Sequence, residues 1–513
     1  MENEGRKKMF SLMKEWRANP SFYPIISVGN DCISDVPFVV SGEIVSKKKM
    51  GLTIREQDEL IRTLRFDACA NGECDFKFSF ELRGCVPNPH TAVFSYITHM
   101  GFDAFIVKNY RTESFQEYLK GRADEPTKSS KEKKAVIIVL ESARAAYFDD
   151  YKEEMPFLHS IAARGCFGST RPVSPTFSAA NALALLTGTY PERNGLFHII
   201  YLDDRDEFVL AASDSITPFY SKEEGVKTLS ALIEGNDRDV AHLESSDDLR
   251  FLEYIADAHA LSVIWVLDTE SELYGDLEDN EVLKKKFSNL DRNLRNFHRT
   301  ITERFPNAMF LFLGDHGISE VKERREWKDV KAIIEKAGIS LDTANIWIDA
   351  GVGVRIWERN PKEAQAHEEK LRKAFSEDSC FYVVDKESKE AMRAPQDRYR
   401  TGDITIGARA GCVIGTEDLP QEYKNVPEEI IASERELLRK REREHSMHGY
   451  YDATHKDLQA FFVIDGAGLS CKNAKADIVD FAPTVADYFG VQTDFSDFQG
   501  VSLYEKILRV TEQ

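Results

Sequence analysis

Residues 308–317 read AMFLFLGDHG, an apolar run that ends abruptly in an aspartate and a histidine. A short continuous apolar run bounded by a glycine has the length and composition of a strand buried on both faces, which is typical of a parallel sheet covered by helices. Ligand sites in such sheets form at the carboxyl ends of the strands. Asp315 and His316 stand at that position, so this stretch predicts a fold and the edge that carries its site.

Two other buried strands also run directly into a carboxylate. AVIIVL (135–140) is followed by Glu141, and LSVIWVL (261–267) is followed by Asp268. One acidic residue after a strand is commonly a helix cap or a turn former. Several that meet at one edge beside a histidine suit a divalent cation, because charged groups that share a dry pocket need a counter-ion.

A further histidine belongs to this set. His448 precedes the apolar strand QAFFVI (459–464), and His445 is its rival in the same segment.

These strands alternate with helical patterns, which indicates an α/β fold with a mainly parallel sheet sandwiched by helices.

Composition divides the chain into two units. Residues 124–134 (DEPTKSSKEKK) have the polar character of a linker. We expect a small N-terminal α/β unit over 1–123, with an amphipathic helix over LTIREQDELIRTLRF (52–66), and a larger domain over 134–513. Strand and helix patterns of their own predict an inserted cap at about 320–445.

The overall charge limits the partners of this 513-residue chain. A formal net charge of −20 disfavours general nucleic-acid binding and anionic lipid surfaces. No apolar run reaches the ~20 residues of a membrane span, and the N-terminus lacks the apolar core of a signal peptide. We therefore expect a cytoplasmic protein, in which the eight cysteines need no disulfides. Nothing in the sequence indicates the oligomeric state.

One segment carries a family resemblance. PTFSAANALALLTGTYPERNG (175–195) resembles, without gaps, the nucleophile region of the alkaline phosphatase superfamily, which includes nucleotide pyrophosphatase/phosphodiesterases, phosphonoacetate hydrolases and sulfatases. In that superfamily the nucleophile opens a helix nine residues before a Thr-Gly pair. The resemblance assigns Ser178, with Thr176 as the alternative two residues out of register.

The other motifs occur in the superfamily's order. VIIVLESAR, LDTESELYG, GDHG and the segment that begins HGYYDATHKD resemble its metal-binding strands, and DIVDFAPTVADYFGV and QGVSL resemble its C-terminal elements. The resemblance implies two divalent ions, most simply zinc. It assigns one ion to Glu141, Ser178, Asp315 and His316, and the other to Asp268, Glu272 and His448.

Two positions depart from the phosphodiesterase pattern. Glu272 stands where phosphodiesterases carry a histidine, which hardens the second site and opens it to manganese or magnesium. His198 and Ile199 occupy the place of an asparagine that contacts phosphate, so His198 is a candidate substrate contact or a packing residue. Asn181 is a candidate to orient a substrate oxygen, or a first-turn helix residue that satisfies backbone groups.

The function that the resemblance implies is hydrolysis of a small phosphorylated substrate. We expect cleavage of a phosphodiester or phosphonate through a phosphoseryl intermediate on Ser178. The alternatives are a phosphotransferase or phosphomonoesterase of the same superfamily, or a non-catalytic binding module on the same fold. A sulfatase is disfavoured, because Ala-Ala-Asn follows Ser178 in place of the signature for formylglycine formation.

Overall fold

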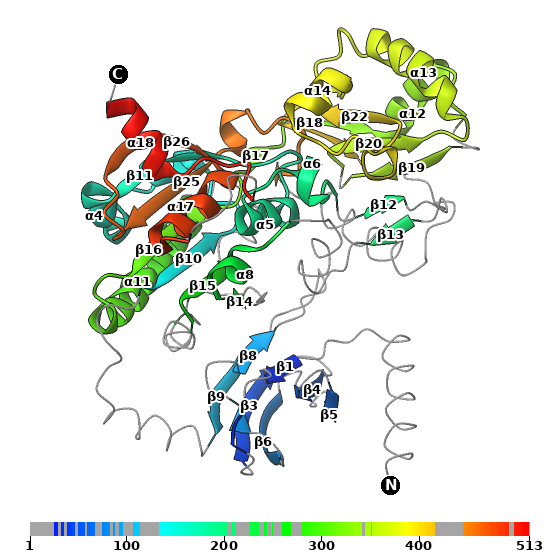
Figure 1. Cartoon of the computed structure of the whole chain (residues 1–513). Helices are drawn as coiled ribbons and strands as arrows, with labels where there is room; N and C mark the ends of the chain where they lie inside the picture. The colour runs from blue at the N-terminus through cyan, green and yellow to red at the C-terminus, as the bar shows by residue number, and fades with distance from the viewer. Residues whose placement is uncertain are drawn as a thin grey trace. The chain divides into compact units, whose positions relative to one another are not determined.

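The chain divides into two compact units, Met1–Ser129 and Ser130–Gln513 (Figure 1). In the first unit, the computed structural model describes the backbone of nine strands. In the second, it describes residues 133–198, 200–202, 208–210, 226–234, 241–243, 246, 249, 259–267, 280–340, 344–349, 351–415, 445–491 and 497–511. Of the expected linker, only 133–134 is among these residues.

The described elements of the first unit are strands. They form a sheet in the order β5-β4-β1-β8, a sheet in the order β6-β3-β9 and the pair β2-β7. Their bounds are β1 (Ile25–Val28), β2 (Cys32–Ser34), β3 (Phe38–Ser46), β4 (Met50–Glu56), β5 (Glu59–Phe66), β6 (Cys74–Leu82), β7 (Val86–Pro87), β8 (Ala92–Ser95) and β9 (Ile106–Thr112).

The helix expected over residues 52–66 is wrong. This stretch forms the antiparallel strands β4 and β5, with Glu56 paired to Glu59. Its β-branched residues and short polar interruption also satisfy a strand pattern, and periodicity alone cannot separate the two structures in a segment this short.

The larger unit is built on a seven-stranded sheet in the order β14-β15-β10-β16-β25-β11-β26. The strands are β10 (Ala135–Leu140), β11 (Cys166–Arg171), β14 (Ala241–Leu243), β15 (Leu261–Val266), β16 (Met309–Gly314), β25 (Ala460–Asp465) and β26 (Cys471–Asp477). β25 is antiparallel to both of its neighbours, and all the other pairs are parallel. The expected mainly parallel sheet is confirmed.

Helices cover both faces of this sheet because its strands are apolar on both sides. In β10, Val136, Ile138 and Leu140 enter one core cluster, and the alternating residues Ala135, Ile137 and Val139 enter the other. The first face carries α3 (Ala145–Asp150), α4 (Pro156–Arg164) and α11 (Asn280–Arg304). The second carries α5 (Ser178–Thr187), α8 (Leu229–Glu234), α17 (Phe481–Phe489) and α18 (Leu503–Thr511) (Figure 1).

A cap with its own apolar core is inserted after β16. The short antiparallel pair β17 (Ser319–Glu320) and β24 (Ser446–Met447) joins the two ends of the insertion. The cap contains the sheet β19-β20-β22-β21 and the pair β18-β23. Its elements are β18 (Glu323–Glu326), α12 (Trp327–Lys336), β19 (Asn345–Ile348), β20 (Gly353–Trp357), α13 (Pro361–Ala374), β21 (Phe381–Val383), α14 (Lys386–Ala391), α15 (Arg398–Thr401), β22 (Ile404–Ala408) and β23 (Cys412–Gly415).

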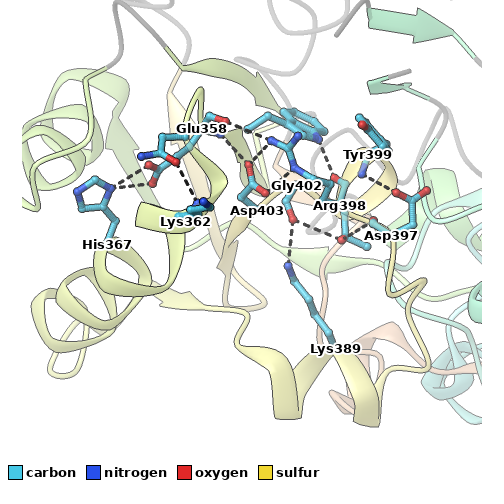
Figure 2. Close-up of polar contacts among 12 residues, drawn as sticks. Glu358, Lys362, His367, Lys389, Asp397, Arg398, Tyr399, Gly402 and Asp403 are labelled. Atoms are coloured by element: carbon cyan, nitrogen blue, oxygen red, sulfur yellow. Dashed lines mark hydrogen bonds and ion pairs between the residues drawn. The ribbon is translucent and has the colours of Figure 1, made fainter. Parts of the chain in front are cut away.

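Polar side chains hold the cap elements together (Figure 2). The carboxylate of Glu358, just after β20, lies 2.8 and 3.0 Å from Nδ1 of His367 on α13. Arg398 donates two hydrogen bonds to Asp403, at 2.7 and 2.6 Å, and Asp403 also accepts from the backbone N–H of Glu358 at 2.8 Å. Glu358, Glu363 and His367 form a cluster that could hold a cation. Because His367 bonds Glu358 directly, the cluster also serves to fix α13 on β20.

Two disulfides are present in the larger unit, although we expected the cysteines to need none. Cys166 pairs with Cys471 between β11 and β26, and Cys380 pairs with Cys412 in the cap. Sequence spacing cannot reveal such pairs, because their members lie 305 and 32 residues apart and meet only in the folded chain. None of the helices in the described part of the chain is long and apolar enough to span a membrane.

A buried ion pair connects the cap to the segment that follows it. The side chains of Asp349 and Arg355 are both fully buried, with an Nη2–Oδ1 distance of 2.7 Å. The hydroxyl of Tyr451 donates to the other oxygen of Asp349 at 2.6 Å. Burial raises the pKa of Asp349, but Arg355, His198 and the hydrogen bond from Tyr451 together outweigh burial, so the pKa is held below its usual value.

Removing one partner of this buried ion pair should lower the free energy of unfolding far more than removing one partner of an exposed ion pair. Asp349→Ala leaves the Arg355 guanidinium buried without its counter-charge, and we expect a loss of about 3–5 kcal/mol in the free energy of unfolding. Glu335→Ala, which breaks the exposed pair with Lys331, should cost under about 0.5 kcal/mol. Urea denaturation measures both. Equal losses would show that the buried pair has no special weight.

Candidate active site

Two of the predicted carboxylates, Glu141 and Asp315, meet at one edge of the sheet. Leu140 pairs with Gly314, so Glu141 and Asp315 follow neighbouring parallel strands at the same level. Ser142 turns the chain sharply with a φ of 58°, a conformation that L-residues rarely adopt. Its backbone N–H donates to Oδ1 of Asp315 at 3.0 Å. The turn after β10 thus fixes the carboxylate that follows β16.

Ser178 is the first residue of α5 and points at this edge. Its Oγ donates to Oε1 of Glu141 at 2.7 Å and lies 3.1 Å from Nε2 of His316. Phe177, just before it, is extended, which lets the helix begin at the serine. The positive end of the helix dipole therefore lies where an alkoxide or a phosphate would carry negative charge.

His316 is surrounded by hydrogen-bond acceptors. Its Nδ1 lies 3.0 Å from the carbonyl oxygen of Gly317, so Nδ1 carries the proton in the neutral ring. Its Nε2 then presents a lone pair to Oδ2 of Asp315 at 3.1 Å and to Ser178 Oγ, whose proton points to Glu141. Facing lone pairs at this distance repel each other unless a proton or a cation lies between them.

This donor set fits a divalent metal ion. Two carboxylates, an imidazole nitrogen and a hydroxyl converge from three separate segments, and ligand atoms about 2.0 Å from a tetrahedral ion lie roughly 3.3 Å apart. The measured separations of 2.7–3.1 Å are close to that spacing. The carbonyl that fixes the His316 tautomer is the kind of outer partner that metal-bound histidines have. Glu141, Ser178, Asp315 and His316 would hold the ion.

His448, and not His445, lies beside this set. Its ring stacks on His316, with 4.2 Å between centroids and 22° between planes. His448 is buried, whereas His445 is exposed. The reversed direction of β25 explains the position, because the segment that enters this strand lies at the edge where the parallel strands end. Asp268 and Glu272, the other expected ligands of the second ion, lie outside the described residues.

Thr176 supports His448 in this structure. Its carbonyl oxygen lies 3.2 Å from Nδ1 of His448 and accepts the Gly449 N–H at 2.8 Å. Its hydroxyl accepts from the same N–H at 3.1 Å. The Thr176 side chain is therefore engaged with backbone, whereas the Ser178 hydroxyl faces Glu141 and His316.

The amide of Asn181 is also engaged with backbone. Oδ1 accepts from the N–H of Val173 at 2.8 Å, and Nδ2 donates to the carbonyl oxygen of Phe177 at 3.0 Å. Both ends of the amide thus hold the loop that leads into α5. These bonds support the structural alternative for Asn181 rather than contact with a substrate.

His198 lies beside the loop that leads into α5. Its ring stacks on Phe177, with 4.8 Å between centroids, and its side chain is only 10% exposed. Nε2 is 3.6 Å from Oδ1 of Asp349 and has no hydrogen-bond partner among the described residues. Burial lowers the pKa of His198 to about 3, although Asp349 opposes the shift and Arg355 adds to it. The ring is therefore neutral at neutral pH.

Three residues around His198 have no recognisable signal in the sequence. Asp349 and Arg355 come from the cap and Tyr451 from the segment after it, and all three are buried. Nothing in their local patterns separates them from ordinary cap and loop residues. Only the packing of the cap against the sheet brings them beside the loop that leads into α5.

Comparison with known proteins identifies the family. The fold and the converging donors define a phosphoric ester hydrolase of the alkaline phosphatase superfamily. The chain belongs to the type I phosphodiesterase / nucleotide pyrophosphatase family, which it matches over residues 135–231 and 236–451. Enzymes of this family generally bind two divalent metal ions. No protein of curated function matches the chain by sequence.

Solved structures share the fold at low identity. Human ectonucleotide pyrophosphatase / phosphodiesterase 5 superposes with a TM-score of 0.54 at 15% identity, covering 73% of this chain and 99% of that one. The murine protein gives 0.55 at 12%, with the same coverage. An inactive variant of the murine protein in complex with AMP gives 0.55 at 12%, covering 74% and 99%.

The neutral state of His198 makes stability depend on pH. Its pKa is lower in the folded chain than the ordinary value of about 6.5, so the unfolded chain takes up a proton first as pH falls. The stability that this residue contributes is therefore complete above about pH 6.5 and is lost below it. Between pH 6 and 5, the free energy of unfolding of the wild type should fall by roughly 1.4 kcal/mol per pH unit relative to that of His198→Phe. Parallel pH profiles in urea denaturation would contradict a buried neutral ring.

Proposed function

We propose that this chain hydrolyses a phosphodiester or phosphonate through a phosphoseryl intermediate on Ser178, with the help of two divalent cations. The observation that carries the proposal is the Ser178 hydroxyl at the start of α5, between Oε1 of Glu141 and Nε2 of His316. A hydroxyl so placed has acceptors for its proton and a helix dipole for its negative charge.

The chain's own groups support the steps of such a reaction. Ser178 Oγ forms a bond to phosphorus while the bond from phosphorus to the leaving oxygen or carbon breaks. The serine proton leaves toward Glu141, and the leaving group takes up a proton from solvent. Water then attacks phosphorus, the bond to Ser178 breaks, and a proton returns to the serine. Divalent cations, when bound, make the hydroxyl more acidic and offset the phosphate charge.

Each of the two sites would combine one imidazole with two carboxylates, a donor set that suits zinc and also admits harder ions. His316 gives the first site its imidazole. The second site would combine His448 with the carboxylates of Asp268 and Glu272, which admit manganese or magnesium.

A small nucleotide is the proposed substrate class. Support comes from the family's description as nucleotide pyrophosphatases and from the complex of the murine relative with AMP. Transfer to an acceptor other than water, or monoester hydrolysis, would use the same serine. Comparing bis-p-nitrophenyl phosphate with p-nitrophenyl phosphate, with and without alcohol acceptors, separates these reactions from diester hydrolysis.

Substitution of the two hydroxyl residues identifies the nucleophile. Ser178→Ala should lower kcat on bis-p-nitrophenyl phosphate by about 10³-fold or more. Thr176→Ala should keep most of the activity and lose about 1 kcal/mol of stability, because the Gly449 N–H loses one acceptor. Steady-state rates and urea denaturation measure the two effects. The opposite pattern of rates would move the nucleophile to Thr176.

Metal removal tests the cofactors. Dialysis against EDTA should abolish activity, and stoichiometric zinc should restore it and raise the Tm, because a ligand that binds only the folded chain stabilises it. His316→Ala should show a smaller rise in Tm with zinc. Fewer than one bound ion per chain by elemental analysis, with no rise in Tm, would instead favour a non-catalytic binding module.

The cytoplasmic location stays a prediction, and the disulfides bear on it. Bonds such as Cys166–Cys471 and Cys380–Cys412 persist in oxidising compartments and are rare in the cytosol. Thiol alkylation of the protein purified without reductant shows which of these cysteines are free.

A further inference from the structure

A cavity of about 580 Å³ lies between the cap and the sheet domain. Residues 171–174 and 451–455 of the sheet domain form one side, and cap residues between 379 and 412 form the other. None of Glu141, Ser178, Asp315, His316 and His448 lines it. A volume of this size is within the range of about 300–1,000 Å³ typical of small-molecule sites.

Three arginines line the cavity, and two of them have carboxylate partners. Arg171 forms two bonds of 2.8 Å with Asp477, and Arg393 donates from Nε to Glu192 at 2.7 Å. Within the described part of the chain, no carboxylate lies at ion-pair distance from Arg409. Its guanidinium lies over the ring of Tyr382, 5.1 Å from the centroid. In a chain with a net charge of −20, this cation on a cavity wall provides local attraction for an anion.

Tyr382, beneath Arg409, adds a hydrogen-bond donor. Its hydroxyl is buried and has no hydrogen-bond partner among the described residues. Burial raises the pKa of Tyr382, and the nearby charge of Asp452 acts in the same direction, against Arg409. The phenol therefore keeps its proton at neutral pH. A buried donor without an acceptor is destabilising, and a ligand oxygen that reaches it would supply the acceptor.

The rest of the wall suits the organic part of a ligand. Pro172, Val173 and Met392 are apolar. Tyr190 contributes an aromatic ring, and the guanidinium of Arg393 lies over this ring, 4.4 Å from its centroid. The single acidic residue of the lining, Asp452, accepts the N–H of Thr454 at 3.0 Å. The wall therefore combines an anion-binding corner with apolar and aromatic surface.

We propose that this cavity is a second ligand site, separate from the catalytic residues, and that it binds a small organic phosphate whose anionic group contacts Arg409 and Tyr382. Arg171, Tyr190 and Arg393 then border the organic part. Because both the cap and the sheet domain line the cavity, a bound ligand would contact both.

Binding of AMP, of adenosine and of inorganic phosphate tests the proposal. By the proposed function AMP also enters the catalytic site, so calorimetric titrations are made in EDTA on His316→Ala and, as a second background, on wild type. AMP should bind with one-to-one stoichiometry in both backgrounds. Adenosine and phosphate should each bind at least about 10-fold more weakly, since each lacks one half of the ligand.

Substitutions in the cavity then locate the site. Arg409→Gln should weaken AMP binding by about 10-fold or more, and Tyr382→Phe by about 3- to 10-fold. Arg359→Gln, at an exposed arginine of the cap outside the cavity, is the matched control and should change nothing. Each variant's Tm shows that it is folded.

Two results would overturn the proposal. One is AMP binding that Arg409→Gln and Tyr382→Phe leave unchanged, which would place AMP elsewhere. The other is no binding of AMP at millimolar concentration in EDTA. Neither result bears on the proposed hydrolysis, because these titrations measure binding without turnover.

Discussion

The structure depends on one electrostatic constraint at the edge of its central sheet. Glu141, Ser178, His316 and Asp315 converge at this edge, with separations of 2.7–3.1 Å between the polar atoms of each successive pair. Such a group of acceptors is stable only when positive charge is shared among them. The start of α5 supplies part of that charge, and a divalent cation is the simplest source of the rest.

The reversed strand β25 completes this edge. Because it runs against its neighbours, the segment before it reaches the ends of β10 and β16 and places His448 on the ring of His316. Backbone bonds from Thr176 fix that segment to the loop that leads into α5. The loop that leads to Ser178 and the segment that carries His448 are thus held by the same few hydrogen bonds, so a change in one should affect the other.

The cap is coupled to the same loop through buried charge. Asp349 binds Arg355 and accepts from Tyr451, and it faces His198, which stacks on the residue before Ser178. The cap and the sheet domain also share the walls of the cavity that contains Arg409 and Tyr382. Both features lie where the cap meets the sheet domain, so the position of the cap decides the surroundings of the active site.

The sequence by itself determined the buried strands, the carboxylates that follow them and the serine that opens a helix, because strand length, apolar character and motif spacing are local properties. It mistook β4 and β5 for a helix, since short amphipathic segments satisfy both periods. Only the tertiary structure decided between His448 and His445, gave Asn181 and Thr176 their backbone partners, paired the cysteines and assembled the Asp349 cluster. These outcomes depend on contacts between residues far apart in the chain, and no local pattern records which distant groups will meet.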